Sequence, residues 1–113
     1  MEVLIILVVA VLFLVWRMKP AKGVRSISAH QLKQELNDSN KVYIDVRTPA
    51  EFKARSIKQF KNIPLGSDLS KLPKDKEIVV ICQSGMRSAQ ACKQLKKLGY
   101  EKVTNVRGGI GSY

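Results

Sequence analysis

The sequence predicts an α/β domain with a mainly parallel central sheet flanked by helices, preceded by one apolar helix. After residue 23, stretches typical of strands alternate with stretches typical of helices, and this order favours a parallel sheet. Residues 78–81 (IVVI) form an uninterrupted β-branched run, which is expected of a strand at the centre of such a sheet. Residues 3–16, in contrast, contain no polar side chain and belong to a separate unit.

Each element of the domain has a local signal. Ser28 is a candidate N-cap with Gln31 three residues later, and the run from Thr48 through Pro49 to Glu51 is a capping-box pattern that starts a short helix. Gly99 ends the last helix. The expected order is strand 24–27, helix 28–36, strand 42–46, a helix from 48, an extended segment 62–65, a helical turn 68–72, strand 78–81, helix 88–98 and strand 103–106.

Three units are predicted along the chain: a transmembrane anchor at residues 1–18, a linker at 19–25 and a folded domain at 26–113. A cleaved signal peptide is disfavoured, because Glu2 precedes the apolar run and no small-residue cleavage site follows it. A helix buried in a small domain would be amphipathic, whereas this one is apolar on all sides. Sixteen helical residues span about 24 Å against roughly 30 Å of hydrocarbon, so a helix lying in the membrane interface is the alternative to a single crossing.

The charge distribution predicts the orientation and the partners. The chain has a net charge of +11, and Arg17, Lys19, Lys22 and Arg25 directly follow the apolar run. By the positive-inside rule, a single-pass protein of the cell membrane would then hold its domain in the cytoplasm. Anionic lipid or small anionic substrates would suit this charge, and so would an ordinary solvated surface. Nucleic acid is not expected as a partner, because no aromatic residues are interleaved with the lysines.

Two cysteines, Cys82 and Cys92, are the candidate reactive groups. A structural disulfide is not expected in a reducing cytoplasm, and two thiols with the single His30 do not form a metal-ligand pattern. No metal and no cofactor are therefore predicted. Cys92 falls on the side of the helix shared with Leu95, so it is interpreted as a core residue, with a resolving thiol as the alternative.

Cys82 occupies the position where catalysis is expected in a parallel sheet. It directly follows the strand 78–81, and active sites lie at the carboxyl ends of such strands. The loop after it leads into a helix, where several backbone N–H groups can point at one spot. Gly85 permits the tight path, and Arg87 adds positive charge. Together these features favour the thiolate and indicate a nucleophile, whereas position alone also fits a small buried side chain that ends a strand.

The motif CQSGMRS at residues 82–88 resembles the active-site loop of the rhodanese-type sulfurtransferases, in which Cys, any residue, Ser or Thr, Gly, any residue and Arg follow one another. Three other segments are similar to further signatures of that family and stand in the expected order. They are IDVRTPAEF at 44–52, NIPL at 62–65 and VRGGI at 106–110. The resemblance covers about residues 27–113.

This resemblance implies a rhodanese-like fold and a membrane-anchored sulfurtransferase that moves sulfane sulfur by way of a persulfide on Cys82. The donor would be a small compound such as thiosulfate, and the acceptor a thiol, a cyanide-like compound or the thiol of a partner protein. Asp45 and Arg47 fall where the family keeps a structural pair beside the loop, which implies a supporting role. The persulfide would be held by the backbone amides of the loop residues Gln83, Ser84, Gly85, Met86 and Arg87.

The chain also departs from the family pattern, and two other functions stay open. Arg55 and Ser56 replace the usual Gly-His step, Gln59 replaces a small residue, and Tyr113 stands in place of a Trp. A Cys-dependent phosphatase or arsenate reductase is one alternative, but its loop resembles Cys, five residues and Arg, while four residues separate the two here. The other alternative is a catalytically silent binding module tethered to a membrane, which the intact thiol disfavours.

Overall fold

The computed structural model describes residues 1–18 and 23–113, with side chains described for 1–14 and 23–113. Residues 19–22 of the predicted linker lie outside the described residues. The elements are α1 (Glu2–Met18), β1 (Val24–Ile27), α2 (Ala29–Glu35), β2 (Lys41–Asp45), α3 (Pro49–Ala54), β3 (Lys61–Asn62), β4 (Glu77–Ile81), α4 (Met86–Lys97), β5 (Val103–Val106) and the 3-10 helix η1 (Gly109–Ser112).

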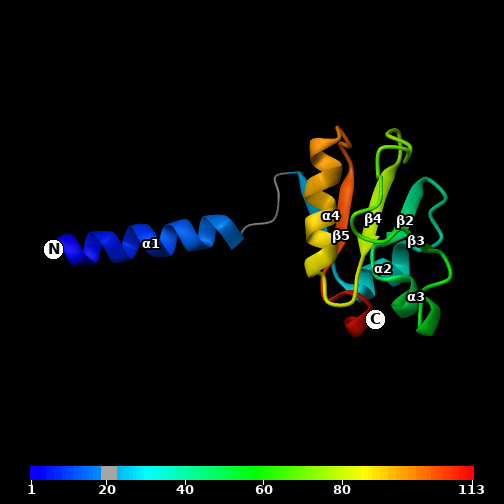
Figure 1. Ribbon diagram of the computed structural model, residues 1–113, viewed down its shortest axis with the longest axis horizontal. Coiled ribbons are helices and arrows are strands. Elements are labelled where there is room, and N and C mark those ends of the chain that lie inside the picture. Colours follow the sequence, from blue (N-terminus) through cyan, green and yellow to red (C-terminus); the bar gives the residue numbers. More distant parts are fainter. Residues whose placement is uncertain (19–22) are drawn as a thin grey trace.

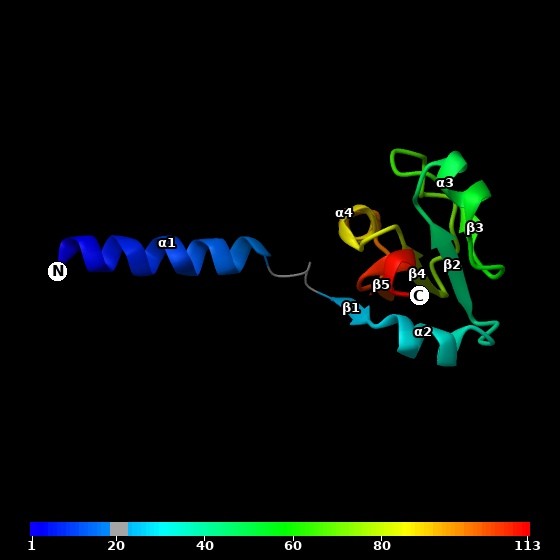
Figure 2. The same cartoon turned by 90° about the horizontal axis from the view of Figure 1, so that it is seen from below.

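A five-stranded parallel sheet organises the domain (Figures 1 and 2). The strand order is β1-β5-β4-β2-β3, and every pair of neighbours is parallel. The sequence-based prediction of an α/β fold with a parallel sheet is therefore confirmed. Strand β4 lies in the middle, and its residues 78–81 are at most 1% exposed, which explains why this stretch is apolar without interruption.

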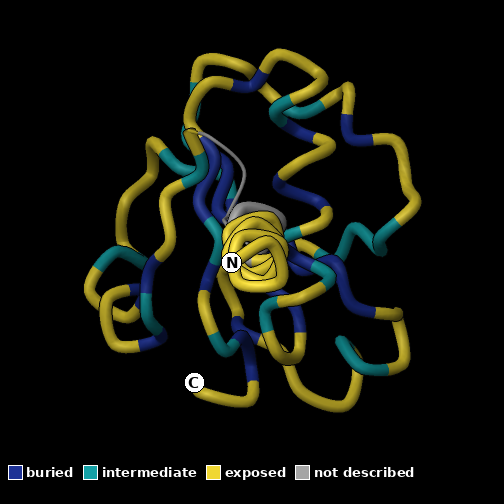
Figure 3. The backbone as a smooth tube through the Cα atoms, turned by 90° about the vertical axis from the view of Figure 1, so that its left-hand side faces the viewer, coloured by how far each residue is buried: buried dark blue, intermediate teal, exposed yellow. Residues whose placement is uncertain are grey.

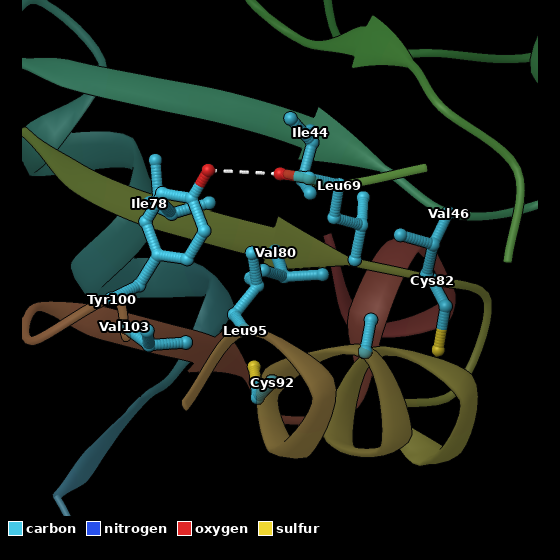
Figure 4. Packing of buried hydrophobic residues seen from close by; sticks show 11 residues of the cluster. Ile44, Val46, Leu69, Ile78, Val80, Cys82, Cys92, Leu95, Tyr100 and Val103 are labelled. Atoms are coloured by element: carbon cyan, nitrogen blue, oxygen red, sulfur yellow. Dashed lines mark hydrogen bonds between the residues drawn. The ribbon is translucent and has the colours of Figure 1, made fainter. Parts of the chain in front are cut away.

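The sheet buries a separate apolar cluster on each face. Helix α4 covers one face through Ala91, Cys92 and Leu95, together with Tyr100 from the turn that follows it (Figure 4). The other face packs against Leu32 of α2 and against η1. Both faces of the sheet are covered, so the residues of the central strand are buried whichever face they point to. The layers are helix, sheet and helix.

The predicted helix caps are present. The Ser28 side chain accepts a hydrogen bond from the Gln31 N–H at 3.1 Å. Thr48 and Glu51 form the complete capping box at the start of α3, with Pro49 in its first turn. These local bonds satisfy N–H groups that a helix leaves unpaired at its start.

One predicted boundary was wrong, and one predicted helical turn forms a turn but no helix. Helix α4 begins at Met86, two residues before the predicted start at Ser88, because Gly85 adopts φ 100° as the N-cap and its carbonyl accepts from the Ala89 N–H at 3.1 Å. Residues 68–72 form no helix, but they contain a turn in which the Leu72 N–H donates to the Leu69 carbonyl at 3.3 Å. There the Asp68 carboxylate accepts from the Ser70 N–H at 2.9 Å, and such a side-chain bond competes with helix formation.

Helix α1 stands clear of the domain (Figures 1 and 2). Residues 1–14 are exposed on every side (Figure 3), in agreement with an apolar helix that finds no place in a small core. At 17 residues the helix is about 25 Å long. None of the helices in residues 1–18 and 23–113 combines the length and the apolar character that crossing a membrane requires, so the predicted transmembrane anchor at 1–18 finds no support in the fold.

Candidate active site

Cys82 lies at the carboxyl end of β4, at the point where the chain turns toward α4 (Figure 4). Its side chain is buried. The Gly85 N–H donates to Cys82 Sγ at 3.0 Å, and the Ser88 hydroxyl lies 3.3 Å from the same sulfur. The loop therefore curls over the thiol and directs hydrogen-bond donors at it.

The hydrogen bonds around Cys82 favour its thiolate. Burial raises the pKa of the thiol, but bonds from the Ser88 hydroxyl and from the backbone of Ser88, Gly85 and Ser84 act in the opposite direction and prevail, so the pKa lies below its usual value. A depressed pKa and a ring of N–H donors at the start of a helix are the features that activate a cysteine as a nucleophile.

The C-terminal turn η1 holds the first part of this loop in place. The Ile110 N–H donates to the Cys82 carbonyl at 2.9 Å, and the Gly111 N–H donates to the Gln83 carbonyl at 3.0 Å. Gly109 has φ +56°, and a Cβ on it would lie only 2.1 Å from the Cys82 carbonyl oxygen. Glycine at this position is therefore what allows the turn to approach the backbone of the candidate nucleophile.

Arg87 is paired with a carboxylate from another element. Its Nη1 and Nη2 donate to the two carboxylate oxygens of Glu51 at 2.7 and 2.9 Å. These bonds from Arg87, with further bonds from Thr48, lower the pKa of Glu51 to about 2. The charge of Arg87 was expected to favour the thiolate, and an electrostatic interaction with Cys82 is present; the guanidinium also ties the loop to the start of α3. Glu51 was anticipated only as a capping residue, because its bond to Arg87 joins positions far apart in the sequence.

Asp45 and Arg47 form a buried ion pair beside the loop. Both carboxylate oxygens of Asp45 accept from the Arg47 guanidinium, at 2.8 to 3.0 Å, and the two side chains are at most 2% exposed. Arg47 also donates to the Arg55 carbonyl at 2.5 Å and to the Gln83 side chain at 3.3 Å. The pair therefore links the end of β2, the end of α3 and the loop that follows Cys82.

Three of the remaining loop residues lie at the surface. Gln83, Ser84 and Met86 are exposed, and Met86 is 80% exposed. The Ser84 backbone forms a hydrogen bond that lowers the pKa of Cys82, and its role in holding a persulfide stays a prediction.

Ser88 and Asn105 belong to the site but were not among the predicted site residues. Ser88 is completely buried, and its hydroxyl lies within 3.3 Å of Cys82 Sγ and 2.5 Å of the Asn105 side-chain oxygen. Ser88 closes the CQSGMRS motif, so its position was available from the sequence. Asn105 comes from β5, and only the pairing of β5 with β4 brings it to the thiol.

Cys92 lies in the core, as predicted. It is completely buried on the inner side of α4 (Figure 4). Burial, with a smaller effect from Cys82, raises its pKa to about 12, so its thiol stays protonated near neutral pH. In the part of the chain that the structure describes, no three His, Cys, Asp or Glu side chains are grouped so that they could hold a metal ion.

Two departures from the family pattern have a defined place. Arg55 ends α3 and supplies the carbonyl that Arg47 binds, a contact that any residue could make through its backbone. Tyr113 packs against the core cluster beside α2, with the Lys33 ammonium 4.7 Å from the centre of its ring. An aromatic ring therefore still closes this end of the domain.

A strand, a thiol and a loop of N–H donors at the carboxyl edge of a parallel sheet define a thiol-based active-site architecture, and the comparisons identify the family. The model of the rhodanese-like domain matches residues 28–113. The chain belongs to the rhodanese-like domain family.

Similar proteins agree with this membership. The chain is 41% identical over 91 residues to a sulfurtransferase of Allochromatium vinosum, an alignment that covers 77% of this chain and 85% of that protein. It is 40% identical over 91 residues to the putative sulfurtransferase YtwF of Bacillus subtilis, with 77% and 87% covered. The crystal structure of a rhodanese-like domain protein from Staphylococcus aureus superimposes with a TM-score of 0.70 at 32% identity, covering 78% of this chain and 89% of the other.

Proposed function

We propose that this protein is a sulfurtransferase that carries sulfane sulfur as a persulfide on Cys82. The observation that supports this most directly is the position of Cys82 Sγ, which receives the Gly85 N–H at 3.0 Å at the carboxyl end of β4. Two relatives of similar length are named as sulfurtransferases, which supports the same chemistry.

The proposed reaction has two steps on one sulfur atom. The Cys82 thiolate attacks the outer sulfur of a donor such as thiosulfate, a new S–S bond forms, and the S–S bond of thiosulfate breaks, so that sulfite leaves with the electron pair. A thiolate or cyanide then attacks the outer sulfur of the persulfide, and Cys82 leaves as the thiolate. The loop N–H groups stabilise the negative charge of both the Cys82 thiolate and its persulfide. A low thiol pKa favours the departure of the Cys82 thiolate in the second step.

The two alternative functions fit the site less well. A phosphatase or arsenate reductase needs a free arginine to hold a tetrahedral oxyanion, whereas Arg87 is occupied by Glu51 through two bonds. A silent binding module has no use for a thiol whose pKa is lowered by directed donors. Asp45 and Arg47 are proposed as supporting residues, because their buried pair anchors the loop from behind.

Mass spectrometry after incubation with thiosulfate tests the proposal. The full-length protein should gain the mass of one sulfur atom and release it as thiocyanate when cyanide is added. The variant Cys82→Ser should do neither, while the matched variant Cys92→Ser should do both, because the buried Cys92 thiol has a pKa of about 12. Thiocyanate production by Cys82→Ser would overturn the assignment, and hydrolysis of an aryl phosphate without sulfur transfer would favour the phosphatase alternative.

We also propose that α1 attaches the domain to a lipid bilayer. Its first 14 residues are exposed on all sides, and an apolar surface of this extent is expected to leave water. Attachment to the cell membrane with the domain in the cytoplasm, as a single-pass protein, stays a prediction that rests on the basic residues after the helix.

Carbonate extraction tests the attachment. The full chain should stay with membranes in high salt, because apolar contact with lipid is not screened, and a variant that lacks residues 1–18 should be released. Release by alkaline carbonate would mean that α1 lies in the interface, whereas retention would support a crossing. Equal partitioning of the full chain and the shortened variant would refute attachment through α1.

A further inference from the structure

The buried Ser88 and the half-buried Asn105 form a polar pair beside the thiol, and the Ser88 hydroxyl lies closer to Asn105 than to the sulfur. The Ser88 oxygen lies 2.5 Å from Asn105 Oδ1 and 3.3 Å from Cys82 Sγ. A hydroxyl has a single proton. Ser88 can therefore donate to the amide oxygen or to the sulfur, but it cannot donate to both at the same time.

The orientation of the Asn105 amide is held by a second contact. Its Nδ2 donates to the Gly85 carbonyl at 3.4 Å, and a rotated amide would place Oδ1 against that carbonyl oxygen. The backbone of Asn105 is fixed as well, because β5 pairs with β1 on one side and with β4 on the other. The amide oxygen is therefore directed at Ser88 and competes with the sulfur for its proton.

We propose that Asn105 is a positioning residue that acts through Ser88 and limits the thiolate fraction of Cys82. In the thiol form, the Ser88 proton binds Asn105 Oδ1 and the Ser88 oxygen is free to accept from the Cys82 S–H. When the thiol releases its proton to solvent, the hydroxyl must turn toward the sulfur and give up its bond to Asn105. The lost bond opposes ionisation, so Asn105 moderates the effect of the donors in the loop.

Other titratable groups face Cys82. Arg87 at the start of α4 and the Cys92 thiol both interact electrostatically with it. Glu51 acts through its ion pair with Arg87. None of these contacts involves Asn105, so changes at position 105 can be separated from their effects.

The inference rests on Cys82 as the reactive thiol of the proposed function, but its test needs no sulfur donor. The rate of alkylation by iodoacetamide is measured against pH in the full-length protein that carries Cys92→Ser, which leaves one thiol. Asn105→Leu should lower the apparent pKa of Cys82 by roughly half a unit, because Ser88 then donates to the sulfur alone. Asn105→Asp should raise it by about one unit, because a carboxylate holds the proton more strongly and repels the thiolate.

Opposite shifts of the apparent Cys82 pKa in Asn105→Leu and Asn105→Asp would distinguish a positioning role from a distortion of the loop. A distorted loop would shift this pKa in the same direction in both variants. Ser88→Ala should raise the apparent pKa by about one unit, and adding Asn105→Leu to Ser88→Ala should then change nothing. An upward shift or no shift in Asn105→Leu, or the same shift with and without Ser88, would overturn the inference. If these pKa shifts are observed but the wild-type protein transfers no sulfur, the proposed function is contradicted and the inference about Asn105 is not.

Discussion

Replacing the buried Gly109 with alanine should disturb the active-site loop. The new Cβ would lie 2.1 Å from the Cys82 carbonyl oxygen and 2.8 Å from the carbonyl carbon and oxygen of Gln83. These are backbone atoms, so no side-chain rotation relieves the contact, and the turn that contains Gly109 must move away. The hydrogen bonds from Ile110 and Gly111 to the same two carbonyls would be lost with it.

The loss of folding stability in Gly109→Ala has two parts, and a control variant separates them. A non-glycine residue in the left-handed region costs about 1 kcal/mol, and two lost hydrogen bonds add about 1 kcal/mol each, so Gly109→Ala should destabilise the domain by roughly 3 kcal/mol. Gly66→Ala is the matched control. It has φ +95°, and nothing in the described structure lies within 4 Å of the added Cβ, so only the backbone cost of about 1 kcal/mol applies.

Urea denaturation of the two variants measures the difference. A gap of about 2 kcal/mol shifts the unfolding midpoint by roughly 1 to 2 M, because the slope for a small domain is about 1 to 2 kcal/mol per M. The alkylation rate of Cys82 at pH 7 should also change in Gly109→Ala and stay constant in Gly66→Ala. Equal destabilisation by both variants would refute the argument that close approach to the loop backbone requires Gly109.

Three further outcomes follow from buried groups. Iodoacetamide at pH 8 should modify Cys82 and leave Cys92 intact in peptide mass spectra, because the Cys92 pKa of about 12 leaves about one Cys92 side chain in ten thousand as thiolate. Modification of both cysteines at similar rates would contradict the placement of Cys92 in the core. Asp45→Ala should cost about 3 to 5 kcal/mol in denaturation, since it leaves the Arg47 charge buried and unpaired, and a loss below 1 kcal/mol would mean that solvent reaches the guanidinium. Tyr100→Phe should cost about 1 kcal/mol, because its hydroxyl lies 2.9 Å from the Leu69 carbonyl (Figure 4) and 2.6 Å from the Leu72 carbonyl and donates its single proton to one of them at a time. Wild-type stability of this variant would show that water replaces the lost bond.

Local chemistry made much of the fold predictable. A run of β-branched residues at 78–81 indicated the central strand, and the capping residues Ser28 and Thr48 marked two helix starts that the structure confirms. Cys82 could be placed at the functional edge because parallel strands all end on the same side of a sheet. The early start of α4 was missed, since Gly85 serves both as the turn and as the N-cap.

The sequence by itself determined the order of the elements, the edge of the sheet that carries the thiol, and the apolar character of α1, because each depends on residues close together in the chain. The tertiary structure alone decided which groups meet there. Glu51 reaches Arg87 from 36 positions away, and Asn105 reaches Ser88 from 17 positions away, because the strand order β5-β4-β2 sets their spacing. Such contacts depend on the packing of whole elements and leave no periodic signal in the sequence, so the hydrogen bonds that tune the candidate nucleophile became visible only in the folded domain.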